Sequence, residues 1–190
     1  MRLLRITFSV LAGLALTAAT VGTANSLRMP TATAPTVTVV AVGDVACAPG
    51  AATTATACRD AATAKLAESM SPDFVLSLGD QQYETGTYAA FMSEYEGTWG
   101  ALKSITEPIP GNHEYKTSGA SGYYKYFADR IPDAAANKGY YATTMGSWKI
   151  LQLNSNCSSM VCGGVDCAAE LTWFKKQLAK TSEQWVAMCM

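Results

Sequence analysis

The sequence predicts an α/β fold with a largely parallel sheet. Short apolar segments rich in β-branched residues alternate with longer helix-compatible segments, which is typical of strand–helix–strand units. Hydrophobic residues make up 49% and charged residues 15% of the 190 residues, which indicates a folded chain rather than a disordered one. This length suits one domain with a buried core and is short for two.

The first half of the chain supplies three predicted strands and two predicted helices. Residues 36–42 are rich in Val and Thr and mostly apolar, as expected for a strand buried on both faces. Residues 51–70 form an alanine-rich segment compatible with a helix, and residues 73–78 form the next strand. Residues 87–103 are the second predicted helix, and residues 105–110 the third strand, which two prolines weaken.

The second half continues the alternation. Residues 140–144 and 148–154 are predicted to form adjacent strands joined by a turn at Met145-Gly146-Ser147. Residues 168–180 have the pattern of an amphipathic helix, and residues 184–190 begin another strand. The sequence contains no internal repeat.

The first two dozen residues have the pattern of a cleaved secretory signal peptide. Arg2 and Arg5 form a positive segment, and residues 6–20 form a largely apolar stretch without charge. Small residues at 22–24 offer a site for signal peptidase. A transmembrane anchor fits less well, since the apolar stretch is short and no stop-transfer charge cluster follows it. We therefore expect secretion to the extracellular space or the cell envelope, without a stable membrane anchor.

Removal of residues 1–24 would leave two regions. Residues 25–35, rich in Thr, Ala and Pro, are predicted to be a flexible leader, and residues 36–190 form the predicted domain. Two of the 14 basic residues would be lost, so 12 basic and 15 acidic side chains would remain, which is a net charge of −3. The sequence has no basic stripe, so neither nucleic acid nor an anionic membrane surface is an expected partner.

If the chain is exported, its six cysteines can form disulfides, because disulfides persist in oxidising compartments. Cys47 and Cys58 bracket a Gly/Ala/Thr loop and are predicted to pair. A second loop contains three cysteines, for which we expect one bridge of open pairing: Cys157, Cys162 and Cys167. A zinc site is the alternative, but it usually shows Cys-x-x-Cys pairs or added histidines. Cys189 is predicted to be a buried free thiol or a cysteine whose partner is missing.

Three short polar motifs each follow a predicted strand. They are Gly43-Asp44, Gly79-Asp80-Gln81-Gln82-Tyr83 and Gly111-Asn112-His113-Glu114. Functional groups of an open α/β sheet gather at the carboxyl ends of its strands. Two carboxylates and an amide oxygen converging there would be unfavourable without cations between them. The three motifs together therefore predict a metal site, although each motif alone is also compatible with a turn or a helix cap.

These motifs resemble the opening half of a metallophosphoesterase of the calcineurin-like superfamily, most closely the purple acid phosphatase branch of secreted bacterial type. The resemblance implies an αββα sandwich, of which this chain supplies the amino-terminal part. It also implies that Asp44 binds one metal ion, Asp80 bridges both ions and Asn112 binds the other.

One detail of the second motif favours the purple acid phosphatase branch. Gly-Asp-x-x-Tyr implies that Tyr83 binds a ferric ion as a tyrosinate. The common superfamily pattern has histidine two residues after the first aspartate, whereas purple acid phosphatases lack it, and here that position is Ala46. The alternative for Tyr83 is an ordinary packed aromatic residue.

The function implied by this resemblance is hydrolysis of phosphate esters by an acid phosphatase-like phosphomonoesterase. The cofactors would be a ferric ion and a divalent ion such as Zn, Fe or Mn, with metal-bound hydroxide as the nucleophile. His113 would protonate the leaving group or stabilise charge there, and Glu114 would orient its ring. The specific substrate, the metal identity and the oligomeric state stay open.

The sequence also departs from this family. His113 is its single histidine, whereas family members take further ligands from a later histidine and from a Gly-His-x-His motif. We therefore expect this chain to be a fragment with negligible phosphatase activity and weak metal retention. The alternative is a secreted non-catalytic binding module on the same scaffold.

Overall fold

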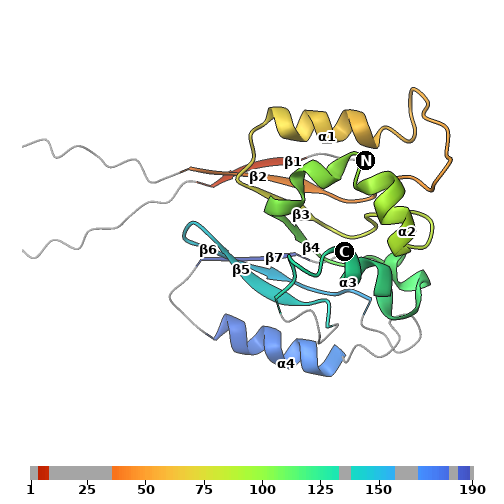
Figure 1. Ribbon diagram of the computed structural model, residues 1–190. Helices are drawn as coiled ribbons and strands as arrows, with labels where there is room; N and C mark the ends of the chain where they lie inside the picture. Colours follow the sequence, from red (N-terminus) through yellow and green to blue (C-terminus); the bar gives the residue numbers. More distant parts are fainter. Residues whose placement is uncertain (1–3, 9–35, 133–137, 157–166, 180–183, 189–190) are drawn as a thin grey trace, which may run out of the picture.

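The computed structural model describes residues 4–8, 36–132, 138–156, 167–179 and 184–188 (Figure 1). It is a mixed α/β structure, which confirms the predicted class. The strands form two sheets. The first has the order β1-β2-β3-β4 and the second the order β5-β6-β7.

The first sheet contains the three strands that precede the polar motifs. These are β2 (Val37–Val42), β3 (Phe74–Ser77) and β4 (Thr106–Pro108), paired in parallel as predicted. The weakest predicted strand, at residues 105–110, is thus confirmed over three residues. Parallel pairing places the carboxyl ends of all three strands at one edge of the sheet.

The fourth strand of this sheet falls inside the predicted signal peptide. β1 (Leu4–Phe8) pairs antiparallel with β2, with Leu4 opposite Ala41 and Phe8 opposite Val37. The rest of the predicted signal peptide and leader, residues 1–3 and 9–35, lies outside the described residues. Cleavage after residue 24 therefore stays a prediction, and it would remove β1 and leave β2 as an edge strand.

The second sheet contains the predicted hairpin. β5 (Tyr141–Met145) and β6 (Trp148–Gln152) pair antiparallel around Gly146, whose φ of 62° requires the left-handed region that glycine adopts easily. β7 (Gln184–Met188) pairs in parallel with β6. The predicted strands at 140–144 and 148–154 are confirmed with small changes at their ends, and the one at 184–190 is confirmed over residues 184–188, since residues 189–190 lie outside the described residues.

The predicted helix at residues 51–70 is confirmed only in its second half, as α1 (Asp60–Ser69). The first half is a loop that Thr54 organises, since its Oγ1 accepts hydrogen bonds from the backbone N–H groups of Ala57 and Thr56 at 2.9 and 3.3 Å. A threonine hydroxyl that bonds nearby backbone competes with helix formation. The alanine-rich composition favours a helix and does not indicate that the Thr54 hydroxyl competes with helix formation.

The predicted helix at residues 87–103 begins where expected and then changes type. Thr87 caps the first turn by accepting a hydrogen bond from the N–H of Ala90 at 3.2 Å. The helical segments are α2 (Tyr88–Ala90), a π-helical turn (Phe91–Tyr95) and a 3₁₀ helix (Trp99–Ile105).

Three helical segments between residues 114 and 126 were not predicted. Two are 3₁₀ turns, Glu114–Lys116 and Ser118–Ala120, and the third is α3 (Ser121–Tyr126). These segments contain glycines and serines, which do not favour the prediction of a helix. Packing of aromatic side chains stabilises α3. Tyr126 stacks on Phe91 with ring centroids 4.8 Å apart.

The remaining helix, α4 (Cys167–Leu178), matches the predicted helix at 168–180. In Figure 1, α1 lies on the outer side of the first sheet and α4 on the outer side of the second, so both sheets lie between helices. No helix in the described part of the chain is long and apolar enough to cross a membrane.

Alternation along β2 divides the core into two clusters. Val40 and Val42 belong to a cluster with α1 and the aromatic residues of the helical segments. Val39 and Ala41 point to the opposite face and pack in a cluster with Ile150 of the second sheet. The two sheets therefore face each other across an apolar layer.

The predicted bridge between Cys47 and Cys58 is confirmed, with the two Cα atoms 5.4 Å apart. Cys167 is disulfide-bonded as well. Cys157, Cys162 and Cys189 lie outside the described residues, so the pairing in the second cysteine loop stays open.

We expect the double variant Cys47→Ser/Cys58→Ser to lose about 2–3 kcal/mol of unfolding free energy, because the closed loop no longer restricts the unfolded chain. Urea denaturation of the variant and the parent protein measures this loss. Parent protein treated with a reductant serves as a second comparison. An unchanged urea midpoint would show that this bridge does not stabilise the fold.

Candidate functional site

The loops after β2 and β3 run side by side beyond the ends of the strands. Val45 N–H donates to the Asp80 carbonyl and Ala46 N–H donates to the Gln81 carbonyl, both at 2.9 Å. These bonds continue the parallel pairing of the sheet for several residues. They place Asp44 beside Asp80, as the sequence predicts for residues at the carboxyl ends of neighbouring strands.

Both aspartates have backbone conformations that are uncommon for residues with a side chain. The φ angle is 55° at Asp44 and 48° at Asp80. Aspartate tolerates this left-handed region better than most residues do, but it still costs free energy. Local strain of this kind persists where the surrounding structure holds it, and here the parallel loop bonds do so.

Tyr83 joins the two carboxylates. Its hydroxyl donates to Asp44 Oδ1, and Asp80 Oδ2 lies 3.2 Å from the same hydroxyl. Partial burial, the hydrogen bond to Asp44 and the charge of Asp80 all raise the pKa of Tyr83 above its ordinary value. Without a cation the phenol stays protonated, whereas a metal ion between these oxygens would favour the phenolate.

The third motif contacts the same aspartate. Asp80 Oδ1 accepts a hydrogen bond from the backbone N–H of His113 at 2.9 Å. Gly111 packs directly on Asp80, because a Cβ at position 111 would lie 2.2 Å from Asp80 Oδ1. Asn112 lies between these two contacts and is exposed. The structure thus brings all three predicted motifs together around Asp80.

Glu114 has a different position from the one expected. Its carboxylate is wholly buried and accepts three backbone N–H bonds, from Asp80 at 2.9 Å, Gly111 at 2.8 Å and Gln82 at 3.1 Å. Burial raises its pKa to about 7. Glu114 therefore joins the second motif to the third, and the His113 ring is held by other groups.

The ring of His113 contacts two residues that sequence reasoning missed. Nδ1 lies 2.8 Å from the Glu84 carbonyl oxygen, and the Lys116 ammonium lies 3.0 and 3.2 Å from Nδ1 and Nε2. The Tyr83 ring meets the same ring edge-on, with centroids 4.2 Å apart. Lys116 follows His113 by three residues, a spacing that places side chains on one side of a helical turn, so this signal was present in the sequence.

A third missed residue is Asn154, which follows β6 and is buried. Its Nδ2 donates to the Tyr115 hydroxyl at 2.8 Å, and Asn156 Nδ2 donates to the Pro110 carbonyl at 3.4 Å. These bonds attach the second sheet to the loop that carries the third motif. No local pattern in the sequence distinguishes Asn154 from other polar residues at strand ends.

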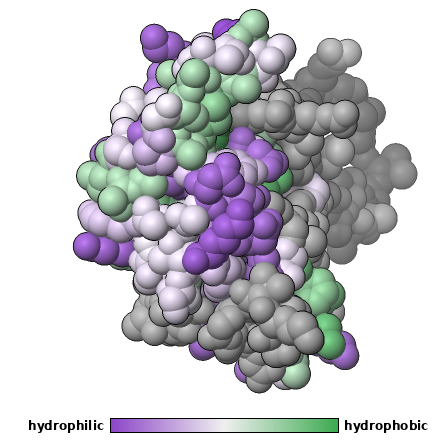
Figure 2. All heavy atoms as spheres, turned by 90° about the vertical axis from the view of Figure 1, so that its right-hand side faces the viewer, coloured by the Kyte–Doolittle hydropathy of each residue, from purple (hydrophilic) through white to green (hydrophobic). Residues whose placement is uncertain are grey.

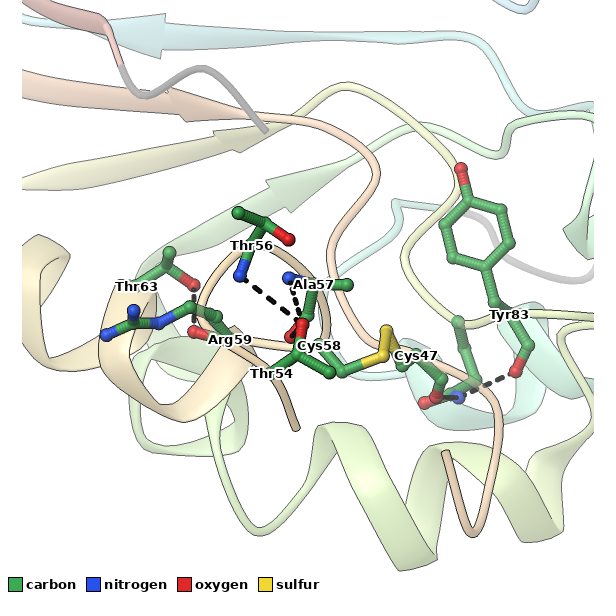
Figure 3. Close-up of a disulfide and its surroundings, with 9 residues drawn as sticks. Cys47, Thr54, Thr56, Ala57, Cys58, Arg59, Thr63 and Tyr83 are labelled. Atoms are coloured by element: carbon green, nitrogen blue, oxygen red, sulfur yellow. Dashed lines mark hydrogen bonds between the residues drawn. A yellow bond between two sulfur atoms is a disulfide. The ribbon is translucent and has the colours of Figure 1, made fainter. Parts of the chain in front are cut away.

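The disulfide supports the second motif from the other side (Figure 3). Buried Gln82 donates through Nε2 to the carbonyls of Cys47 and Tyr83, at 2.8 and 2.9 Å. In Figure 3 the phenol of Tyr83 points away from the disulfide. A cavity of about 170 Å³ beside Asp44 is lined by the disulfide, Thr56 and the first turn of α1.

The site lies at the edge of the molecule where the carboxyl ends of β2 and β3 are found. Figure 2 shows this side of the molecule, and hydrophilic residues gather near its centre. Asp44 is exposed, Tyr83 is partly buried and Asp80 is buried, so solvent reaches the pair from the Asp44 side.

The donors that lie together here are oxygens, two carboxylates and a phenol. Hard cations such as ferric iron, manganese or magnesium prefer this donor type. Within the described ranges, no group of three or more His, Cys, Asp or Glu side chains could hold a metal ion. Asp44, Asp80 and Tyr83 thus have the chemistry of part of a metal site, and Asn112 is exposed next to the His113 N–H that contacts Asp80.

No family model matches the chain, and no curated protein matches it.

Proposed function

We propose that this chain carries the active-site half of a phosphate-ester hydrolase with a dinuclear metal centre. The single observation that supports it best is the convergence of the Tyr83 hydroxyl with Asp44 and Asp80 at the ends of two parallel strands. Asp44, Asp80, Tyr83 and Asn112 would be metal ligands, and phosphate monoesters would be the substrates. The two sheets with α1 and α4 outside them support an αββα sandwich of the metallophosphoesterase type.

Each residue has a role in this proposal that its position supports. Two bound cations would polarise the phosphoryl oxygens and lower the pKa of a water molecule for attack on phosphorus. Asp80 directs its two carboxylate oxygens toward different neighbours, Tyr83 and the backbone of His113, and would be the ligand that the two cations share. His113 would donate a proton to the leaving oxygen or stabilise charge there, and Glu114 would keep the motifs in register.

The proposed reaction needs more ligands than these four residues provide. Cations of this kind usually take about six ligands each, and waters supply only some of them. The protein is also proposed to be exported, with the first 24 residues acting as its signal.

Ferric iron provides a direct test of the site, because a tyrosinate bound to ferric iron absorbs visible light. We expect the purified chain saturated with ferric iron to develop this absorption. Tyr83→Phe should lose the absorption and keep the fold, since the change removes only the hydroxyl. Visible spectroscopy together with circular dichroism measures both outcomes.

Tyr88→Phe is the matched control, because Tyr88 packs under Lys125 and belongs to α2 rather than to the site. Iron binding without colour in the parent protein would make Tyr83 a packing residue. Failure to bind iron, manganese or zinc, in this chain and in a longer protein that includes it, would favour the non-catalytic binding module.

A further inference from the structure

A cavity of about 270 Å³ lies between the end of β6 and the first turns of α4. Three apolar side chains contribute to its walls: Leu153, Leu171 and Phe174. Because an apolar cavity of about 150 Å³ already holds a benzene molecule, this one has room for an aromatic ring with a short side chain. Leu171 is half exposed and Ser155, which also lines the cavity, is exposed, so the cavity opens to solvent on that side.

One wall of this cavity carries a buried carboxyl group, that of Glu170, which is only 7% exposed. Its Oε1 accepts the backbone N–H of Asn154 at 2.7 Å. Its Oε2 is buried as well and has no hydrogen-bond partner in the described part of the chain. The bond to Asn154 thus gives one oxygen a structural role and leaves the other oxygen without one.

Glu170 also has no counter-charge within the described residues, since none of their ion pairs includes it. Burial raises the pKa of its carboxyl group above the ordinary value, and the hydrogen bond from Asn154 opposes this rise. A carboxylate away from water is costly unless a cation and hydrogen-bond donors accompany it. A cationic donor beside Oε2 would supply both.

We propose that this cavity binds a small organic ammonium ion, whose N–H groups bond to Oε2 of Glu170 and whose apolar body contacts Leu171 and Phe174. An ammonium group donates hydrogen bonds and accepts none, which suits an ionised carboxylate oxygen. The charge makes this bond about twice as strong as a bond between neutral groups, so an ammonium is favoured over an alcohol of the same shape. A metal ion would find one carboxylate among apolar walls, which is too few oxygen ligands.

A pair of small ligands tests the proposal on the full chain without metal, at about pH 8, where an alkyl ammonium stays charged. Phenethylamine is the probe, because it joins an ammonium group to one aromatic ring. In isothermal titration calorimetry we expect a dissociation constant on the order of 1 mM or lower. Phenethyl alcohol has the same body without the charge and should bind about tenfold more weakly. Equal binding of the two compounds, or no binding of the amine, would overturn the proposal.

The backbone amide of Asn154 reports where the amine binds, because its N–H donates to the Glu170 carboxylate. Proton–nitrogen correlation NMR of the chain should show this amide signal moving as phenethylamine is added. The signal of Glu68, which is exposed on α1, should stay in place. Binding that leaves the Asn154 signal unchanged would place the amine elsewhere and contradict the proposal.

Two variants separate the charge of this cavity from its walls. Glu170→Gln keeps an oxygen for Asn154 and removes the charge, so it should weaken phenethylamine binding by about tenfold or more. Leu171→Ala shortens a half-exposed side chain of the wall and should weaken binding by about threefold, with little effect on the fold. Glu68→Gln is the matched control and should bind the amine as the parent chain does.

Unchanged affinity in either cavity variant would refute the proposed contacts. Circular dichroism checks that each variant is folded, and the Leu171 variant and the alcohol decide the outcome if Glu170→Gln is not. The measurements need neither metal ion nor ester. Failure of the proposed hydrolysis therefore leaves this result standing, and failure of amine binding leaves the proposed metal site untouched.

Discussion

In a metal-loaded protein that contains this chain and hydrolyses phosphate esters, Asp80→Ala is expected to abolish the hydrolysis, with a loss in kcat/KM of at least about 10³-fold. The second and third motifs meet at this side chain, and Tyr83 links it to Asp44 of the first motif. One carboxylate oxygen lies 3.2 Å from the Tyr83 hydroxyl, and the other accepts the backbone N–H of His113 at 2.9 Å. Its removal takes away the proposed bridging ligand and the anchor of the third motif together. Hydrolysis of an aryl phosphate and the metal content of the purified protein measure the two losses.

Asp80→Asn removes the negative charge of this side chain and keeps its shape. Asparagine retains an oxygen that can accept the His113 N–H. We expect it to lose metal and activity nearly as completely as alanine does, while its fold stays closer to that of the parent protein. Asp129→Asn is the matched control, since Asp129 forms an exposed ion pair with Lys103. Retained metal and turnover in both Asp80 variants would refute the assignment of the second motif.

Glu114→Ala is expected to lower the free energy of unfolding by about 3–5 kcal/mol. The change leaves three backbone N–H groups, of Asp80, Gly111 and Gln82, without their acceptor in the interior. Unpartnered buried donors are costly because water does not replace the lost bond. The net loss is a large fraction of the stability of a typical domain. Urea denaturation followed by tryptophan fluorescence measures it.

Glu114→Gln should lie between the parent and the alanine variant, because glutamine keeps one acceptor oxygen and turns an N–H₂ group toward the remaining donors. Glu68→Ala, at an exposed position on α1, controls for the loss of a glutamate. If Glu114→Ala unfolded at the parent's urea midpoint, Glu114 would not be the structural link that its hydrogen bonds indicate. If Glu114→Ala were as stable as the parent protein and changed only the His113 ring, Glu114 would have the orienting role that the sequence predicts.

The elements that could be predicted are those whose cause lies within a few residues. Thr87 begins a helix because its own hydroxyl caps the first turn. Gly146 joins two strands because its left-handed conformation suits a tight turn. Cys47 and Cys58 could be paired because the loop between them is short.

The loop at residues 51–59 and α3 show where local reasoning was insufficient. Alanine-rich composition favours a helix, but hydrogen bonds of the Thr54 hydroxyl and the bridge at Cys58 hold the loop. Gly119 and Gly122 disfavour a helix locally, yet α3 forms because Tyr123 and Tyr126 are buried in the aromatic cluster. Tertiary packing outweighed propensity in both places.

The sequence by itself determined the three strands that precede Asp44, Asp80 and Asn112. It did so because the apolar strand pattern and the polar motif lie next to each other in the chain. Parallel pairing then made their convergence predictable, since neighbouring parallel strands end at the same edge. The tertiary structure alone decided which strands pair in each sheet, that Glu114 joins two motifs and that Lys116 and Glu84 contact His113. Each of those outcomes depends on satisfying hydrogen-bonding groups or burying apolar faces with partners far away in the chain, and a local pattern does not specify which distant partner that will be.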